Sequence, residues 1–316
     1  MSICLFVPLR KELKYAKEIL GKYGDLSTKK SSIVQYKFNG ILYKHSFNIH
    51  VCLIDDMGNW PTAAYVAWAL GRLRPKIAIL AGIAGSMNAD ILPVGGVVLS
   101  NRAKTIYANK VKQRDEDELF VSKYDNTISG KIQIDVRERI FSDSFFRNKR
   151  RYYNPVPMNG ELGGFVVEMQ NRARSSGASK EISDVISGIQ VGQIFSGDLV
   201  IDCKDALEYI LEKVTDDQLD YYVQTDKRKP KDSDMSYDPA DWNYELPIAV
   251  DMESAGFLHA IQIDESGITP FIVRGISDLC AQKNDDHQAL AAKNAIVSAL
   301  LVAEEAIRSG AMIKID

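Results

Sequence analysis

Short apolar runs alternate with amphipathic segments along most of this chain. The apolar runs predict strands over residues 3–7, 49–55, 76–81, 94–100, 188–195, 250–254 and 271–278. Helical patterns follow over 11–21, 57–73, 255–261 and 288–307, with a further one ending near 214. The run at 76–81 is almost entirely apolar, which is typical of a strand covered by helices on both faces. The alternation predicts an α/β protein with a largely parallel sheet.

We therefore expect a single domain over residues 1–316, folded as a three-layer α/β/α sandwich around a central mixed, largely parallel twisted sheet. Two ranges interrupt the pattern, at about 112–187 and 216–247, and we interpret both as variable insertions. The first range holds a charged run at 113–118 and a basic run at 147–151. Solvated faces are the expected explanation of such runs, and contact with a nucleotide phosphate is the less favoured one.

Composition points to small-molecule chemistry. Hydrophobic residues make up 46% of the chain, charged residues 26%, and the formal net charge is −3. These values suit a protein with a sizeable core and give no electrostatic reason to expect nucleic acid or a membrane as partner.

The cysteines and the N-terminus bear on location. Cys4, Cys52, Cys203 and Cys280 lie far apart, which argues against both a zinc site and a disulfide framework. The first residues lack the charged lead and long apolar core of a signal peptide, and no apolar run is long enough to span a bilayer. We expect a cytoplasmic protein without a bound metal.

Two carboxylates follow neighbouring predicted strands. The run at 271–278 ends in Arg274, Ser277 and Asp278, and the run at 250–254 contains Glu253. Because ligands of open α/β sheets bind beyond the carboxyl ends of the strands, we expect these residues to meet at one site. Two acids in different settings can act as separate acid and base.

A glycine-containing segment follows the strand at 76–81. Its residues Ile83, Ala84 and Gly85 indicate close backbone approach to a flat or hydroxylated ligand. The segment lacks the dinucleotide-binding spacing, and no Gly-Lys-Thr/Ser sequence follows it. The sequence therefore gives no sign of a nicotinamide cofactor or of P-loop chemistry, and no cofactor is expected.

Five motifs occur in an order that resembles the nucleoside phosphorylase/nucleosidase superfamily, with most similarity to the 5'-methylthioadenosine/S-adenosylhomocysteine nucleosidases. They are Gly58-Asn59, the segment 81–85, Ser196-Gly197-Asp198, the segment 250–253 and the segment 274–278. The resemblance runs from the first strand to the last helix. It implies hydrolysis of the N-glycosidic bond of a purine nucleoside or nucleotide, and a homo-oligomer, either a dimer or a hexamer.

The resemblance also implies catalytic roles. Asp278 would donate a proton to N7 of the departing purine, and Ser277 would orient that acid. Glu12 would position and activate the attacking water, with Arg274 beside it to orient its carboxylate. A carboxylate base opposite a carboxylic acid is the logic of glycoside hydrolysis.

Substrate-binding roles follow in the same way. Glu253 would hold the ribose hydroxyls, and Met252 would pack against the ribose face. Val200 and Ile201 would lie beside the base, with Val200 at the place where related enzymes carry an aromatic side chain. Purine binding is therefore a firmer expectation than adenine specificity.

Each of these residues could also serve a purely structural purpose. Asp278 occupies a position typical of a helix N-cap, and Glu12 and Glu253 are also typical of acids that stabilise the first turn of a helix. Met252 also suits a core position.

Departures from the family bear on the reaction and on the substrate. Leu80 and Ile83 stand where phosphorylases of the superfamily carry phosphate-binding side chains, which disfavours phosphorolysis. Arg10 lies in a turn that resembles their phosphate-binding turn. It is either a solvent-exposed cation or a ligand for the phosphate of a substrate such as AMP or ATP. In the second case the chain would resemble the nucleotide-cleaving effectors of bacterial antiphage systems. The sequence also leaves open a phosphate-dependent purine nucleoside phosphorylase and an inactive nucleoside-binding module.

Overall fold

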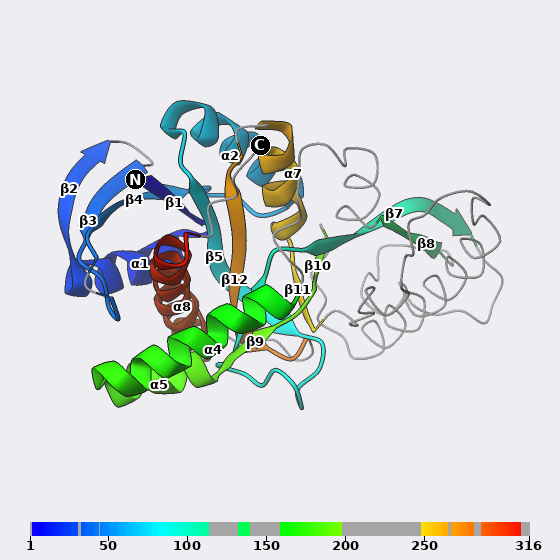
Figure 1. The fold of residues 1–316 in the computed structure, drawn as a ribbon. Coiled ribbons are helices and arrows are strands. Elements are labelled where there is room, and N and C mark those ends of the chain that lie inside the picture. The colour runs from blue at the N-terminus through cyan, green and yellow to red at the C-terminus, as the bar shows by residue number, and fades with distance from the viewer. Residues whose placement is uncertain are drawn as a thin grey trace, which may run out of the picture.

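The structure, a computed structural model, describes residues 2–30, 33–43, 45–113, 132–139, 159–197, 248–264, 267–280 and 286–310. Within these ranges the strands form one twelve-stranded mixed sheet with helices on both faces (Figure 1). The expected three-layer α/β/α sandwich is confirmed.

The centre of the sheet is parallel. Strand β1 (Ser2–Val7) lies between β4 (Phe47–Leu53) and β5 (Ile77–Ser86), and β12 (Thr269–Asp278) pairs with β5 on its other side. All three pairings are parallel, so β1, β5 and β12 end at the same edge. Strand β11 (Ala249–Asp251) runs antiparallel to the end of β5. This edge is where the sequence predicts the site.

The remaining strands extend the sheet on both sides. The antiparallel strands β2 (Gly24–Lys30) and β3 (Ile33–Phe38) continue it beyond β4. β6 (Val97–Ser100) pairs with β12 and with β9 (Ile189–Val191), and β10 (Ile194–Gly197) lies between β11 and β7 (Ala103–Gln113). β7 then continues as a ribbon with β8 (Ile132–Arg139), away from the central strands (Figure 1).

The prediction that the third strand ends at Ala81 in a glycine turn is wrong. Strand β5 continues through Gly82 to Ser86. Its glycine-containing half pairs with β12 on one side, and Gly85 pairs with Val250 of β11 on the other. Neighbours on two edges supply the backbone hydrogen bonds that outweigh the tendency of glycine to form turns.

Two apolar cores cover the two faces of the sheet. Helices α1 (Arg10–Tyr23), α4 (Asn159–Ser176), α5 (Lys180–Ser187) and α8 (Gln288–Arg308) cover one face (Figure 1). Helices α2 (Asn59–Leu73) and α7 (Ser254–Asp264) cover the other. Alternate residues of the central strands enter opposite cores: Leu5 and Val7 join the first, and Cys4 and Phe6 the second.

The second half of the range 112–187, interpreted above as a variable insertion, contains two helices that pack on the core. Leu162 and Met169 of α4 and Ile182 and Ile186 of α5 are buried in the first core. The apolar residues of α4 are interrupted by glycines and charged residues, and α5 is only eight residues long although its buried Ile182, Val185 and Ile186 follow helical spacing, so neither helix was recognised from sequence. The basic run at 147–151, the range 216–247, Cys203, Val200 and Ile201 lie outside the described residues.

Within the described ranges, no helix is long and apolar enough to cross a membrane.

Candidate active site

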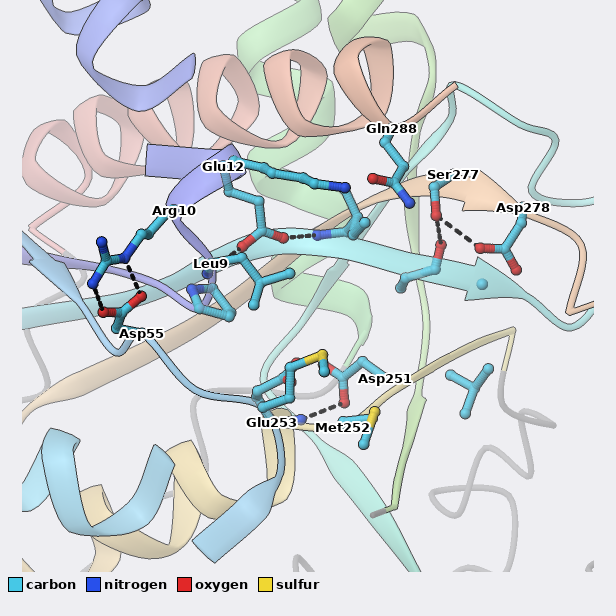
Figure 2. A pocket seen from close by; sticks show the side chains of 17 residues that line it. Leu9, Arg10, Glu12, Asp55, Asp251, Met252, Glu253, Ser277, Asp278 and Gln288 are labelled. Atoms are coloured by element: carbon cyan, nitrogen blue, oxygen red, sulfur yellow. Dashed lines mark hydrogen bonds and ion pairs between the residues drawn. The ribbon is translucent and has the colours of Figure 1, made fainter. Parts of the chain in front are cut away.

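A pocket of about 550 Å³ lies at the carboxyl edge of the central strands (Figure 2). It is lined by the turn from β1 into α1, the end of β5, the turn from β11 into α7, and the end of β12. The residues expected at the site from the sequence that line it are Arg10, Glu12, Ile83, Ala84, Gly85, Met252, Glu253, Ser277 and Asp278. Residues far apart in the sequence thus meet in one cavity.

Glu12 is held by backbone amides. It lies in the first turn of α1 and is buried. Its Oε2 accepts a hydrogen bond of 2.8 Å from the amide of Leu9, and Oε1 accepts one of 2.9 Å from the amide of Ile83. Burial raises the pKa of this carboxyl, against the opposing effect of Arg274 and of the two amides. Glu12 is therefore both an acid in the first turn of a helix and a residue of the pocket lining.

Asp278 ends β12 at the other side of the pocket from Glu12 (Figure 2). The hydroxyl of Ser277 donates to its Oδ2 at 2.8 Å, and the amide of Cys280 donates to its Oδ1 at 3.0 Å. Asp278 does not cap α8, which begins at Gln288. Ser277 therefore contacts the carboxyl that it was expected to orient.

Arg274 is the fully buried centre of a charge cluster beneath the pocket. Its Nε donates to Oδ2 of Asp251 at 2.7 Å, and its Nη2 donates to Oε2 of Glu253 at 3.0 Å. The expectation that Arg274 orients Glu12 is therefore incomplete, because its direct ion pairs are with these two carboxylates and the amides hold Glu12. A buried guanidinium needs such partners to offset its lost hydration.

Gly82 makes this arrangement possible. It pairs with Arg274 across β5 and β12, so its missing side chain leaves the space through which the arginine crosses β5 to reach β11. A Cβ at Gly82 would lie 2.4 Å from Nη1 of Arg274 and 2.7 Å from Oε1 of Glu12. Both atoms therefore flank Gly82. Nη1 has no hydrogen-bond partner among the described residues.

Glu253 directly precedes α7 and is buried at the pocket wall. Its Oε1 accepts a hydrogen bond of 3.3 Å from the amide of Gly58, a residue with a positive φ of 104°. Burial raises the pKa of Glu253 to about 7; Arg274 opposes this rise, and the nearby carboxyls of Asp251 and Glu12 add to it. The pKa values of Glu253 and Glu12 are thus raised by the same cause, burial, and lowered by the same cation, Arg274.

Sequence reasoning missed Asp251 as a member of the site. Its carboxylate binds Arg274, the Ser254 hydroxyl and, at 3.3 and 3.2 Å, the amides of Glu253 and Ser254. It lines the pocket and fixes the turn from which Glu253 projects. The signal was an acid two residues before Glu253 that ends an apolar run.

The Gly58-Asn59 motif also contributes to the site. Oδ1 of Asn59 accepts hydrogen bonds from the Ser196 hydroxyl at 3.0 Å and from the Gly256 amide at 2.8 Å. These contacts fix the start of α2 against the first turn of α7. The motif therefore positions Glu253 both directly, through the Gly58 amide, and indirectly, through the contact of Asn59 with the first turn of α7.

Arg10 lies at the pocket mouth and is paired. Its Nε and Nη2 donate to the two carboxylate oxygens of Asp55, at 2.7 and 2.5 Å (Figure 2). The side chain of Arg10 is 77% exposed and that of Asp55 is 40% exposed. The guanidinium lowers the pKa of Asp55. Asp55 is a second lining residue that sequence reasoning missed, because 45 residues separate it from Arg10.

Acids outnumber cations in this pocket. The carboxyl groups in its lining come from Glu12, Asp55, Asp251, Glu253 and Asp278. The cations of the lining are Arg10 and Lys11, and Arg274 lies beneath it. Such a lining favours a ligand that becomes positively charged over an anionic one. No group of three or more residues among those described could hold a metal ion.

No protein-family model and no curated protein matches this chain. Solved structures do. A 5'-methylthioadenosine/S-adenosylhomocysteine nucleosidase of Helicobacter pylori is 15% identical with a TM-score of 0.54, covering 96% of this chain and 98% of its own. Futalosine hydrolase of the same organism is 14% identical with a TM-score of 0.52, and the match covers 98% of this chain and 98% of that one. The 5'-methylthioadenosine/S-adenosylhomocysteine nucleosidase of Neisseria meningitidis in complex with methylthio-immucillin-A is 16% identical with a TM-score of 0.52, and the match covers 96% of this chain and 98% of that one. At these identities the likeness confirms the expected fold.

Proposed function

We propose that this chain, which has the fold of these nucleosidases, hydrolyses the N-glycosidic bond of a purine nucleoside. The observation that carries the proposal is the placement of Glu12 and Asp278 on opposite sides of one pocket that Glu253 also lines (Figure 2). A nucleoside bound across these residues would present its base to Asp278 and its ribose to Glu253 and Glu12.

Asp278 is the proposed general acid. Protonation of N7 lets the base accept the electrons of the breaking C1'–N9 bond and leave as a neutral molecule. The contacts of Asp278 with the Ser277 hydroxyl and the Cys280 amide hold the carboxyl at the end of β12. A fixed acid at the pocket wall supports the proposal, since proton transfer requires hydrogen-bond reach to N7.

Glu12 is the proposed general base. A water oxygen would attack C1' as the bond to N9 breaks, and its proton would pass to the Glu12 carboxylate. Glu12 can receive this proton readily because burial raises its pKa. Nη1 of Arg274 flanks Gly82 together with Oε1 of Glu12, so a positive charge lies close to the proposed base.

Glu253 and Met252 are the proposed ribose contacts. The Glu253 oxygens keep lone pairs for the sugar hydroxyls beyond their bonds to Gly58 and Arg274. The ionised carboxyls of Glu253 and Glu12 would stabilise the positive charge that develops on the ribose as the base departs.

Hydrolysis is proposed over phosphorolysis because the lining offers no phosphate site on β5. Leu80 is buried in the second core and Ile83 presents an apolar side chain to the pocket. A phosphate dianion would meet several carboxylates there instead of cations.

A panel of adenosine, inosine, guanosine and methylthioadenosine, incubated with and without inorganic phosphate, tests the proposal. We expect release of free base and free ribose product without phosphate, with adenine as the preferred base. A requirement for phosphate, with formation of ribose 1-phosphate, would establish phosphorolysis instead. Binding of nucleosides without any base release would establish a binding module.

A further inference from the structure

The Arg10–Asp55 ion pair is an element of the described pocket lining that bears on charge at the far end of the substrate. It lies at the opposite end of the cavity from Ser277 and Asp278, with Glu12 and Glu253 in between (Figure 2). If the base lies at Asp278 and the ribose at Glu253, as proposed above, then the 5' substituent of the sugar faces this pair. The inference rests on that proposed function.

Arg10 presents the fork that binds phosphate best, but its fork is occupied. Two of its N–H groups point at the two oxygens of Asp55, in the bidentate geometry that carboxylates and phosphates share. A 5'-phosphate would therefore have to displace Asp55. An exposed ion pair rearranges at little cost, so displacement alone is a weak barrier.

The charge of Asp55 is the stronger barrier. After displacement the carboxylate would remain in the same lining, next to a phosphate dianion. An aspartate with an ordinary pKa of roughly 3.9 is ionised at neutral pH even without its arginine partner. Glu12 and Glu253 lie farther along the same cavity and add repulsion of the same sign.

We propose that Asp55 is a specificity-determining residue that occupies Arg10 and so selects nucleosides without a 5'-phosphate over nucleotides. Arg10 is thereby a neutralised cation of the pocket mouth. The pair still offers both a donor fork and an acceptor to an uncharged polar 5' group.

Equilibrium binding of adenosine and of AMP, measured by calorimetry with Asp278→Asn added to each protein for these binding measurements so that no base is released, tests this proposal without turnover. We expect the wild-type protein to bind adenosine more tightly than AMP by about tenfold or more, as one uncompensated charge near a phosphate implies. Asp55→Asn should shift this ratio toward AMP by about tenfold, because the amide keeps the shape and the positive φ of 63° but loses the charge. Asn and Asp both tolerate that backbone conformation.

Two further variants make the test specific. Asp56→Asn removes the neighbouring exposed acid, which does not line the pocket, and should leave the ratio unchanged. Arg10→Gln combined with Asp55→Asn should lose the gain in AMP binding, because the gain requires the freed guanidinium.

The outcomes separate this inference from the proposed function. An Asp55→Asn protein with an unchanged ratio, a wild-type protein that prefers AMP, or a protein that binds neither ligand would overturn the role of Asp55. Wild-type preference for adenosine with the expected shift in Asp55→Asn, but no release of base, would sustain the role of Asp55 and contradict the proposed hydrolysis.

Discussion

Arg274 and Arg10 form the same kind of ion pair in opposite surroundings. Arg274 is fully buried and binds Asp251 and Glu253 beneath the pocket, whereas Arg10 is largely exposed and binds Asp55 at its mouth. A buried charge loses its hydration and is costly unless oppositely charged or hydrogen-bonding groups contact it. Solvent screens the charges of an exposed ion pair. The contrast leads us to expect that the buried cluster stabilises the site and that the exposed pair can rearrange when a ligand enters it.

Replacement of Arg274 should break the inner half of this comparison most strongly. Arg274→Met would leave Asp251 and Glu253 buried without their cation, which costs about 3–5 kcal/mol of the free energy of unfolding. Urea denaturation measures this loss. A variant with wild-type stability would show that the buried carboxyls are neutral in the native protein and that the cluster needs no cation.

Gly82→Ala should have the next largest effect. The new Cβ would meet Nη1 of Arg274 at 2.4 Å and Oε1 of Glu12 at 2.7 Å, both in buried side chains. We expect a loss of about 1–3 kcal/mol, together with a loss of base release. Gly71→Ala in α2 is the matched control, because no atom lies within 4 Å of its Cβ and alanine favours a helix by roughly 0.5–1 kcal/mol. Equal stability of the two variants would contradict the crossing of Arg274 beneath β5.

The fold was largely readable from sequence, and the pairing of charges was not. Strands β1 and β12 contain nearly continuous apolar runs, which are typical of strands buried on both faces of a parallel sheet. The partner of Arg274 depends on β11 lying across β5 from β12, which is a fact of tertiary register. The sequence therefore placed Arg274 at the site and chose Glu12 as its partner, where the structure has Asp251 and Glu253.

The pocket mouth was the hardest part to predict. Nothing local marks Asp55 as the partner of Arg10, because the pair forms only where the ends of β1 and β4 meet. The face of the pocket expected at Val200 and Ile201 lies outside the described residues, so its contribution stays a prediction. The homo-oligomer and the choice of adenine also stay predictions, because both depend on contacts with other molecules that a single chain does not contain.

The pH dependence of base release should sharpen the description of the buried carboxyls. The pKa of Glu253 is raised to about 7 and that of Glu12 is raised as well, so both bind protons at higher pH than ordinary glutamates. Their proposed roles require the ionised form. We therefore expect kcat/KM to fall, by up to about tenfold per pH unit, as the pH drops through this value. A profile that stays flat down to about pH 5, near the ordinary range of a glutamate, would show that neither carboxyl must be ionised.

Replacement of Arg10 should have the smallest effect on stability. Arg10→Met removes an exposed ion pair whose two partners are both solvated, so the urea midpoint should not change. A clear loss of stability would show that the outer pair supports the turn between β1 and α1 and would remove the contrast with Arg274.

Release of free base by Asp278→Asn tests the central claim most directly. The amide keeps the size of the side chain and an acceptor for the Cys280 amide, but it has no acidic proton for N7. Asp90→Asn, at an exposed position outside the pocket lining, is the control. We expect base release from the preferred nucleoside to fall by about 100-fold or more in Asp278→Asn and to be unchanged in Asp90→Asn. Wild-type rates in a folded Asp278→Asn protein would contradict the proposed mechanism.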